Sequence, residues 1–95
     1  MDQETLENNE IATKVPIGAI FRHYKGKEYK ILSIGRHSED LSHYVVYQGL
    51  YDGKEFGKYP VWVRPLKMFL ETVEVNDKIV PRFTLTHLPY SNEQK

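Results

Sequence analysis

Apolar and polar residues alternate over several short stretches of this chain, which is the pattern of β-strands rather than of long helices. The stretches that predict strands are residues 19–24, 28–35, 43–51, 59–64 and 79–86. The third is rich in Tyr and Val, which favour strands. In the last, Ile79, Phe83 and Leu85 fall on one side, so a half-buried strand is expected. The stretch of residues 28–35 is apolar on both faces around Leu32, which indicates a closed sheet or a β-bulge.

Turn signals separate the strands, and one segment has helical spacing. Gly26 in Lys25–Lys27 can adopt a positive φ, and Asn76–Asp77 is typical of a tight turn. After Pro65, apolar residues recur with the 3.6-residue period of a helix face, at Leu66, Phe69, Leu70 and Val73. Two turns are too short to be stable alone, so this segment is expected to plug one end of the sheet. Its C-terminal boundary is open, because Val73 also fits a strand.

Five short strands and one short helical turn predict an all-β fold, a small five-stranded SH3-like barrel. A barrel of the oligonucleotide-binding type is the alternative. Residues 14–90 are expected to form this single domain. Residues 1–13 are expected to be a flexible acidic arm or a frayed helix, and residues 91–95 a disordered tail.

Length and composition bound the class of protein. The 95 residues suit one domain, and 40% hydrophobic residues suffice for a folded core. The absence of cysteine excludes a disulfide framework, thiol catalysis and cysteine-bound zinc, and it fits a reducing compartment. No apolar run approaches the roughly 20 residues that span a bilayer, and the first residues are acidic rather than basic. A cytoplasmic protein without membrane contact is therefore expected.

The formal net charge is zero, but the charges are unevenly placed. Residues 14–64 hold nine Lys and Arg against five Asp and Glu, whereas residues 1–13 hold four acids and no Lys or Arg. A local basic face is compatible with an anionic ligand. It is too weak to indicate general nucleic-acid binding, which requires a clearly basic domain. A solvated hairpin is the alternative interpretation.

Aromatic residues and arginines supply the candidate binding surface. Tyr47 and Tyr51 point to one face of a strand, with a glycine between them, so a planar group could stack in the slot; alternatively, both rings pack on the core. Trp62 and Arg64 share a face in the same way. The planar guanidinium forks of Arg64 and Arg82, each next to a proline, suit carboxylate or phosphate. Alternatively, these arginines pair internally with Glu39 or Glu71.

Residues 35–40 combine a cation, a base, a hydroxyl and two acids. Consecutive side chains diverge, so His37, Ser38 and Glu39 cannot form a catalytic triad among themselves. A general acid–base role for His37 or His23, with Glu39 as a further candidate, is chemically possible. His37, Glu39 and His43 match no recognised metal-ligand spacing, so no metal is expected. A polar turn between two strands accounts for most of the segment, with Arg36 and His37 left as candidate contacts.

Several short motifs, in order, resemble a small bacterial family known as domain of unknown function 1653, from about residue 18 to residue 85. The motifs are His23-Tyr24-Lys25-Gly26, Tyr29, Arg36-His37-Ser38-Glu39, Val46-Tyr47-Gln48 with Leu50-Tyr51, Trp62-Val63-Arg64-Pro65 with Met68-Phe69, and Pro81-Arg82-Phe83. The resemblance implies that many polar and aromatic positions recur and line one site. It implies no activity. The chain departs from the family pattern in a longer 52–59 loop and at His43-Tyr44.

The predicted function is that of an uncharacterised binding module for an anionic or planar ligand, such as a nucleotide, a single-stranded nucleic acid or an acidic peptide. The predicted ligand-binding residues are Lys25, Arg36, His37, Tyr47, Tyr51, Trp62, Arg64 and Arg82. No cofactor is expected. The alternatives are a small hydrolase that uses His37 or His23, and a structural domain that forms homo-oligomers. A monomer and a homodimer both remain open.

Overall fold

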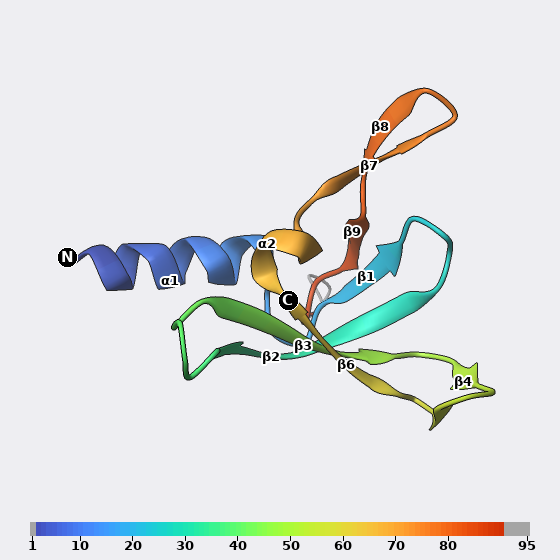
Figure 1. Ribbon diagram of the computed structural model, residues 1–95, viewed down its shortest axis with the longest axis horizontal. Coiled ribbons are helices and arrows are strands. Elements are labelled where there is room, and N and C mark those ends of the chain that lie inside the picture. The colour runs from blue at the N-terminus through green and yellow to red at the C-terminus, as the bar shows by residue number, and fades with distance from the viewer. Residues whose placement is uncertain (1, 91–95) are drawn as a thin grey trace.

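The computed structural model describes residues 2–90, and most of the regular structure in them is β-strand (Figure 1). The elements are α1 (Gln3–Lys14), β1 (Ile20–His23), β2 (Glu28–Arg36), β3 (His43–Gly49), β4 (Asp52–Gly53), β5 (Gly57–Lys58), β6 (Val61–Pro65), α2 (Leu66–Phe69), β7 (Thr72–Val75), β8 (Lys78–Pro81) and β9 (Phe83–His87). The prediction of a mainly β fold with one short helical turn after Pro65 is confirmed.

Five strands form one antiparallel sheet in the order β6-β3-β2-β1-β9. The pairs β4–β5 and β7–β8 are separate two-stranded hairpins. The edge strands β6 and β9 do not pair with each other, so the sheet stays open. The predicted SH3-like barrel is therefore not confirmed, although the sheet has the expected five strands.

The last predicted strand is divided, which is one reason that the sheet stays open. Asn76 and Asp77 adopt φ values of 52° and 67°, and this tight turn folds β8 back onto β7. Only β9 continues along β1. The backbone amide of Arg82, between β8 and β9, donates to the carbonyl of Glu71 at 2.9 Å. In Figure 1 the β7–β8 hairpin projects away from the sheet.

Two local predictions are confirmed in β2 and its turn. The register of β2 against β3 shifts between Ile31 and Ser33, which is the expected bulge and leaves Leu32 exposed. The bulge explains why apolar residues occupy both sides of this strand. Gly26 has a φ of 114°, which a glycine adopts without steric cost.

The core lies on one face of the sheet and is aromatic. Its buried residues are Val15, Ala19, Phe21, Ile31, Val45, Tyr47, Phe69 and Phe83. The short α2 helix places Phe69 in this core, where its ring stacks on that of Phe83 with centroids 4.1 Å apart. The helical segment thus packs against the core face of the sheet, and it ends at Phe69, before β7 begins at Thr72.

Residues 3–14, where the sequence predicts a flexible arm or a frayed helix, form the helix α1. The carboxylate of Asp2 accepts a hydrogen bond from the Thr5 amide at 2.8 Å and caps the helix. No residue of α1 is buried, and in Figure 1 the helix extends away from the sheet. The tail predicted at residues 91–95 lies outside the described residues. Within residues 2–90, no helix is long and apolar enough to cross a membrane.

Candidate functional site

A pocket of about 220 Å³ lies on the core-bearing face of the sheet and draws side chains from all five strands. Its lining residues are His23 (β1), Tyr29 (β2), Tyr47 (β3), Trp62 and Arg64 (β6), and Phe83 (β9). Strand pairing brings them together, since Tyr47 faces Trp62 and His23 faces Phe83 in register. The predicted binding residues Tyr47, Trp62 and Arg64 therefore do converge.

Arg64 brings a half-buried positive charge to this pocket without a counterion. Its Nε donates a hydrogen bond to the Tyr47 hydroxyl at 3.1 Å, and its Cζ lies 5.8 Å from the centre of the Phe83 ring. Within residues 2–90, no carboxylate lies within 4 Å of the guanidinium nitrogens, and its two terminal nitrogens form no hydrogen bond. These two nitrogens are free to bind an external anion. The internal ion pair considered for Arg64 is not formed.

Arg82 is the second cation near the pocket, and it is partly neutralised. Its Nη2 lies 3.3 Å from a carboxylate oxygen of Glu71, which is one of the two internal partners considered from the sequence. Its Nε is buried and has no hydrogen-bond partner. A buried donor without a partner carries a free-energy cost, which an added acceptor would remove.

The pKa of His23 is lowered by burial and by these positive charges. Burial is the largest cause that lowers the pKa of its imidazole below 6.5, and the charges of Arg64, Arg82 and Lys25 lower it further. The backbone amide of Lys25 donates to the ring Nδ1 at 3.2 Å. The neutral ring therefore carries its proton on Nε2, which makes that atom a hydrogen-bond donor. Lys25 itself lies in the β1–β2 turn.

Tyr51 does not form the open slot with Tyr47 that the sequence suggested. Its hydroxyl accepts a hydrogen bond from the Trp62 indole at 3.1 Å and lies 3.4 Å from the Tyr29 hydroxyl. Burial, followed by this contact with Tyr51, raises the pKa of Tyr29. The Nζ atom of Lys27 lies 4.5 Å from the Tyr51 ring centre. Because Tyr47 is buried, both rings support the pocket rather than offer a free stacking surface.

Gly49 lies directly under the Tyr51 ring, so we expect Gly49→Ala to destabilise the protein by about 1–3 kcal/mol. A Cβ atom at residue 49 would lie 2.4 Å from Cε2 of Tyr51 and would force the ring to move. Urea unfolding measures the loss. Gly35→Ala is the matched control. Gly35 lies in the neighbouring strand β2, and a Cβ atom there would meet no atom within 4 Å. Equal effects of the two variants would contradict this packing.

Arg36, His37 and Glu39 lie away from this pocket. Arg36 ends β2, about seven residues or roughly 20 Å along the strand from Tyr29. Figure 1 shows the β2–β3 loop and the β1–β2 turn at opposite ends of the sheet. In that loop the ring Nδ1 of His37 accepts a hydrogen bond from the Glu39 amide at 3.1 Å, which is a local turn contact. Of the histidines named as candidate acid–base groups, only His23 therefore lies beside Arg64 and Arg82.

The part of the chain that the structure describes contains no group of three or more His, Asp or Glu side chains that could hold a metal ion. The combination of His37, Glu39 and His43 considered above does not form such a group. The residues that line the pocket supply guanidinium, imidazole, phenol, indole and phenyl groups.

His23 was predicted only as a candidate acid–base group, and two further pocket residues, Tyr29 and Phe83, are absent from both the predicted ligand-binding and the candidate catalytic residues. Tyr29 faces Gly49 in register, and Gly49 is two residues from Tyr47 in β3, so strand pairing puts Tyr29 on the same side as Tyr47. Phe83 begins β9 after the break at Arg82. The one signal that pointed to both was their place in the short motifs of the family resemblance.

Comparisons with known proteins bear on the same part of the chain. A family model described as "Protein of unknown function (DUF1653)" matches residues 19–85, which include all six residues that line the pocket. The chain is similar to a solved structure from Bordetella bronchiseptica, a protein belonging to the same family. The two are 31% identical with a TM-score of 0.65, and the similarity covers 79% of this chain and 92% of that chain. No curated protein matches the chain.

Proposed function

Because the chain belongs to the DUF1653 family of proteins of unknown function, we propose from its own pocket that it is a binding module for an anionic group, with Arg64 as the principal cation. The observation that carries this proposal is the half-buried guanidinium of Arg64, which has no counterion within residues 2–90. Removing a charge from water is costly unless it is paired. A bound anion supplies the missing partner, and the two terminal nitrogens offer it a planar pair of donors.

The surrounding charges favour an anion over a neutral or cationic ligand. Arg82 and Lys25 both act on His23 with the same sign as Arg64. None of the six lining residues is acidic. The Nε2 proton of His23 is a further donor at the pocket, and Arg82 adds positive charge near it. This arrangement resembles the preorganised donors by which proteins hold carboxylate and phosphate groups.

The volume of the pocket limits the size of the ligand group that it can enclose. Sites that enclose a whole small ligand usually exceed about 300 Å³, so a pocket of about 220 Å³ suits an anionic group with a small planar part. A neighbouring pocket of about 480 Å³ also includes His23, together with the cations Arg22 and Lys78. The rest of a nucleotide, an acidic peptide or a short single-stranded nucleic acid would lie along this second pocket.

Nuclear magnetic resonance titration with phenyl phosphate tests the proposal. We expect saturable shifts of the His23 ring, the Arg64 Nε–H and the Trp62 indole N–H. Inorganic phosphate should bind more weakly because it lacks the ring, and phenol should not bind because it lacks the charge. Affinity should fall as ionic strength rises. Binding of phenol as tight as that of phenyl phosphate, or shifts spread over the whole surface, would overturn the proposal.

A further inference from the structure

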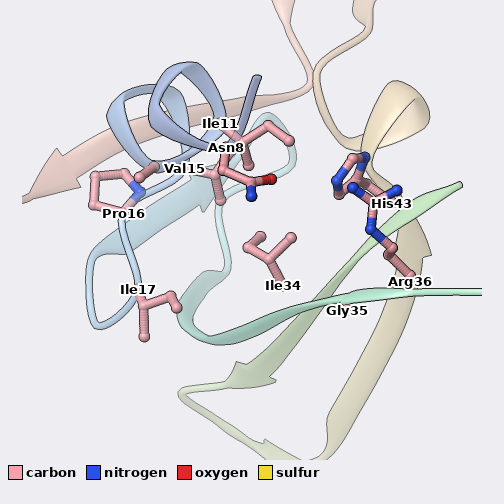
Figure 2. A pocket seen from close by; sticks show the side chains of 10 residues that line it. Asn8, Ile11, Val15, Pro16, Ile17, Ile34, Gly35, Arg36 and His43 are labelled. Carbon is pink, nitrogen blue, oxygen red and sulfur yellow. The ribbon is translucent and has the colours of Figure 1, made fainter. Parts of the chain in front are cut away.

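A larger pocket, separate from the one around Arg64, lies between α1 and the opposite end of the sheet (Figure 2). Its volume of about 560 Å³ falls in the range of sites that enclose a small molecule. Ile11 of α1 and Val15 after it form one wall, and Ile34 of β2 faces them. Val15 is fully buried, whereas Ile11 is only half-buried, so the part of this wall that α1 supplies is incompletely covered. The pocket therefore presents an apolar surface from two sides.

The other side of the pocket is polar and positively charged. Arg36 and His43 are directly opposite each other on β2 and β3, and Figure 2 shows their side chains together at one side of the pocket, with the Asn8 amide between them and the apolar wall. No Asp or Glu lines the pocket. These three side chains supply hydrogen-bond donors, and only that of Arg36 is permanently charged.

Arg36 is held in place but is only weakly neutralised. Its Nη1 donates to the Leu41 carbonyl at 2.9 Å, which fixes the guanidinium at the end of the sheet. Its Nη2 lies 3.6 Å from the carboxylate of Glu4, whose side chain is 70% exposed. An exposed pair at that distance contributes little free energy, so a ligand can displace it.

We propose that this pocket binds a small carboxylic acid with an apolar body. The carboxylate would pair with Arg36 and accept hydrogen bonds from Asn8 and His43, while the apolar body would lie between α1 and Ile34. Charge complementarity selects a monoanion, because one permanent cation serves the site. Asn8, Ile11 and Val15 precede residue 19, where the family match begins, so this site belongs to the present chain rather than to the matched domain as a whole.

Titration with octanoate, followed by nuclear magnetic resonance, tests this proposal. We expect saturable shifts of the backbone amides of residues 8–17, 34–36 and 43. Octanol, which lacks the charge, should bind at least about tenfold more weakly, since a charge-assisted hydrogen bond is lost. Acetate, which lacks the apolar body, should not bind measurably. Equal affinities of octanoate and octanol, or no saturable octanoate binding at all, would overturn the proposal.

Three variants assign the binding to this pocket. Arg36→Gln should weaken octanoate binding about tenfold or more, whereas Glu4→Gln should leave it unchanged or tighten it by removing the competing carboxylate. Arg64→Gln is the matched control and should have no effect, so this site and the proposed phosphate site fail or succeed independently. Ala12→Phe fills the pocket from an exposed position of α1 and should block octanoate without lowering the free energy of unfolding. Octanoate binding that survives both Arg36→Gln and Ala12→Phe would place the ligand elsewhere.

Discussion

Replacing Phe69 with alanine is expected to lower the free energy of unfolding by about 3–5 kcal/mol. The Phe69 side chain is 1% exposed and stacks on Phe83, and its ring also has edge contacts with Phe21 and Tyr47 at centroid distances of 5.3 and 5.5 Å. The α2 helix is one turn long and contributes no other buried residue. Truncation would therefore leave a cavity in the middle of the aromatic core. A loss of this size is a large part of the stability of a small domain.

Urea unfolding followed by circular dichroism measures this effect. Met68→Ala is the matched control, because Met68 is the preceding residue in the same turn and its side chain is 42% exposed. We expect it to change the free energy of unfolding by no more than about 0.5 kcal/mol. If the two variants lose equal stability, Phe69 is not the residue that fixes α2 to the sheet.

Replacing Arg64 with glutamine is expected to weaken the binding of phenyl phosphate by about 10-fold to 150-fold, which is the range of about 1.5–3 kcal/mol for hydrogen bonds to charged groups. Glutamine removes the charge and the planar pair of nitrogens but keeps an amide near the Tyr47 hydroxyl. Isothermal titration calorimetry gives the affinities. Because Arg64 has no ion pair within residues 2–90, its replacement should cost only about 1 kcal/mol of stability.

Arg36→Gln is the control for this experiment, since Arg36 is not among the residues that line the pocket around Arg64. It should leave the affinity for phenyl phosphate unchanged. An equal loss in both variants would indicate a general electrostatic attraction rather than a site at Arg64.

The sequence predicts the five strands of the main sheet because each depends on local alternation and local turns, whereas it does not predict the short hairpin strands β4 and β5. The barrel prediction is not confirmed, because sheet closure depends on which distant strands pair. Val73 fitted both a helix and a strand, and once residues 72–75 form β7, the Asn76–Asp77 turn returns β8 to β7. Only a short β9 is then left to pair with β1, and it forms an edge of the sheet rather than closing it.

Part of the candidate site likewise follows from local sequence pattern, and part of it depends on how the strands pair. That Trp62 and Arg64 share a face follows from the two-residue period of a strand and needs no knowledge of the fold. The place of Arg36 does not follow from that period, which gives the face of the sheet but not the position along it. Tyr29 was missed because only the pairing of β2 with β3 places it beside Tyr47: Tyr29 is opposite Gly49, two residues from Tyr47.

The pKa of the His23 ring, measured by nuclear magnetic resonance with and without benzenesulfonate, tests the central claim most directly, because this probe stays ionised throughout the titration. In the free protein, burial and the charges of Arg64, Arg82 and Lys25 hold this pKa below 6.5. An anion bound among these cations stabilises the imidazolium, so the pKa should rise. By linkage, the affinity should then increase as pH falls through the range in which the bound form gains its proton. A His23 pKa that stays the same at saturating benzenesulfonate would contradict an anion site at Arg64.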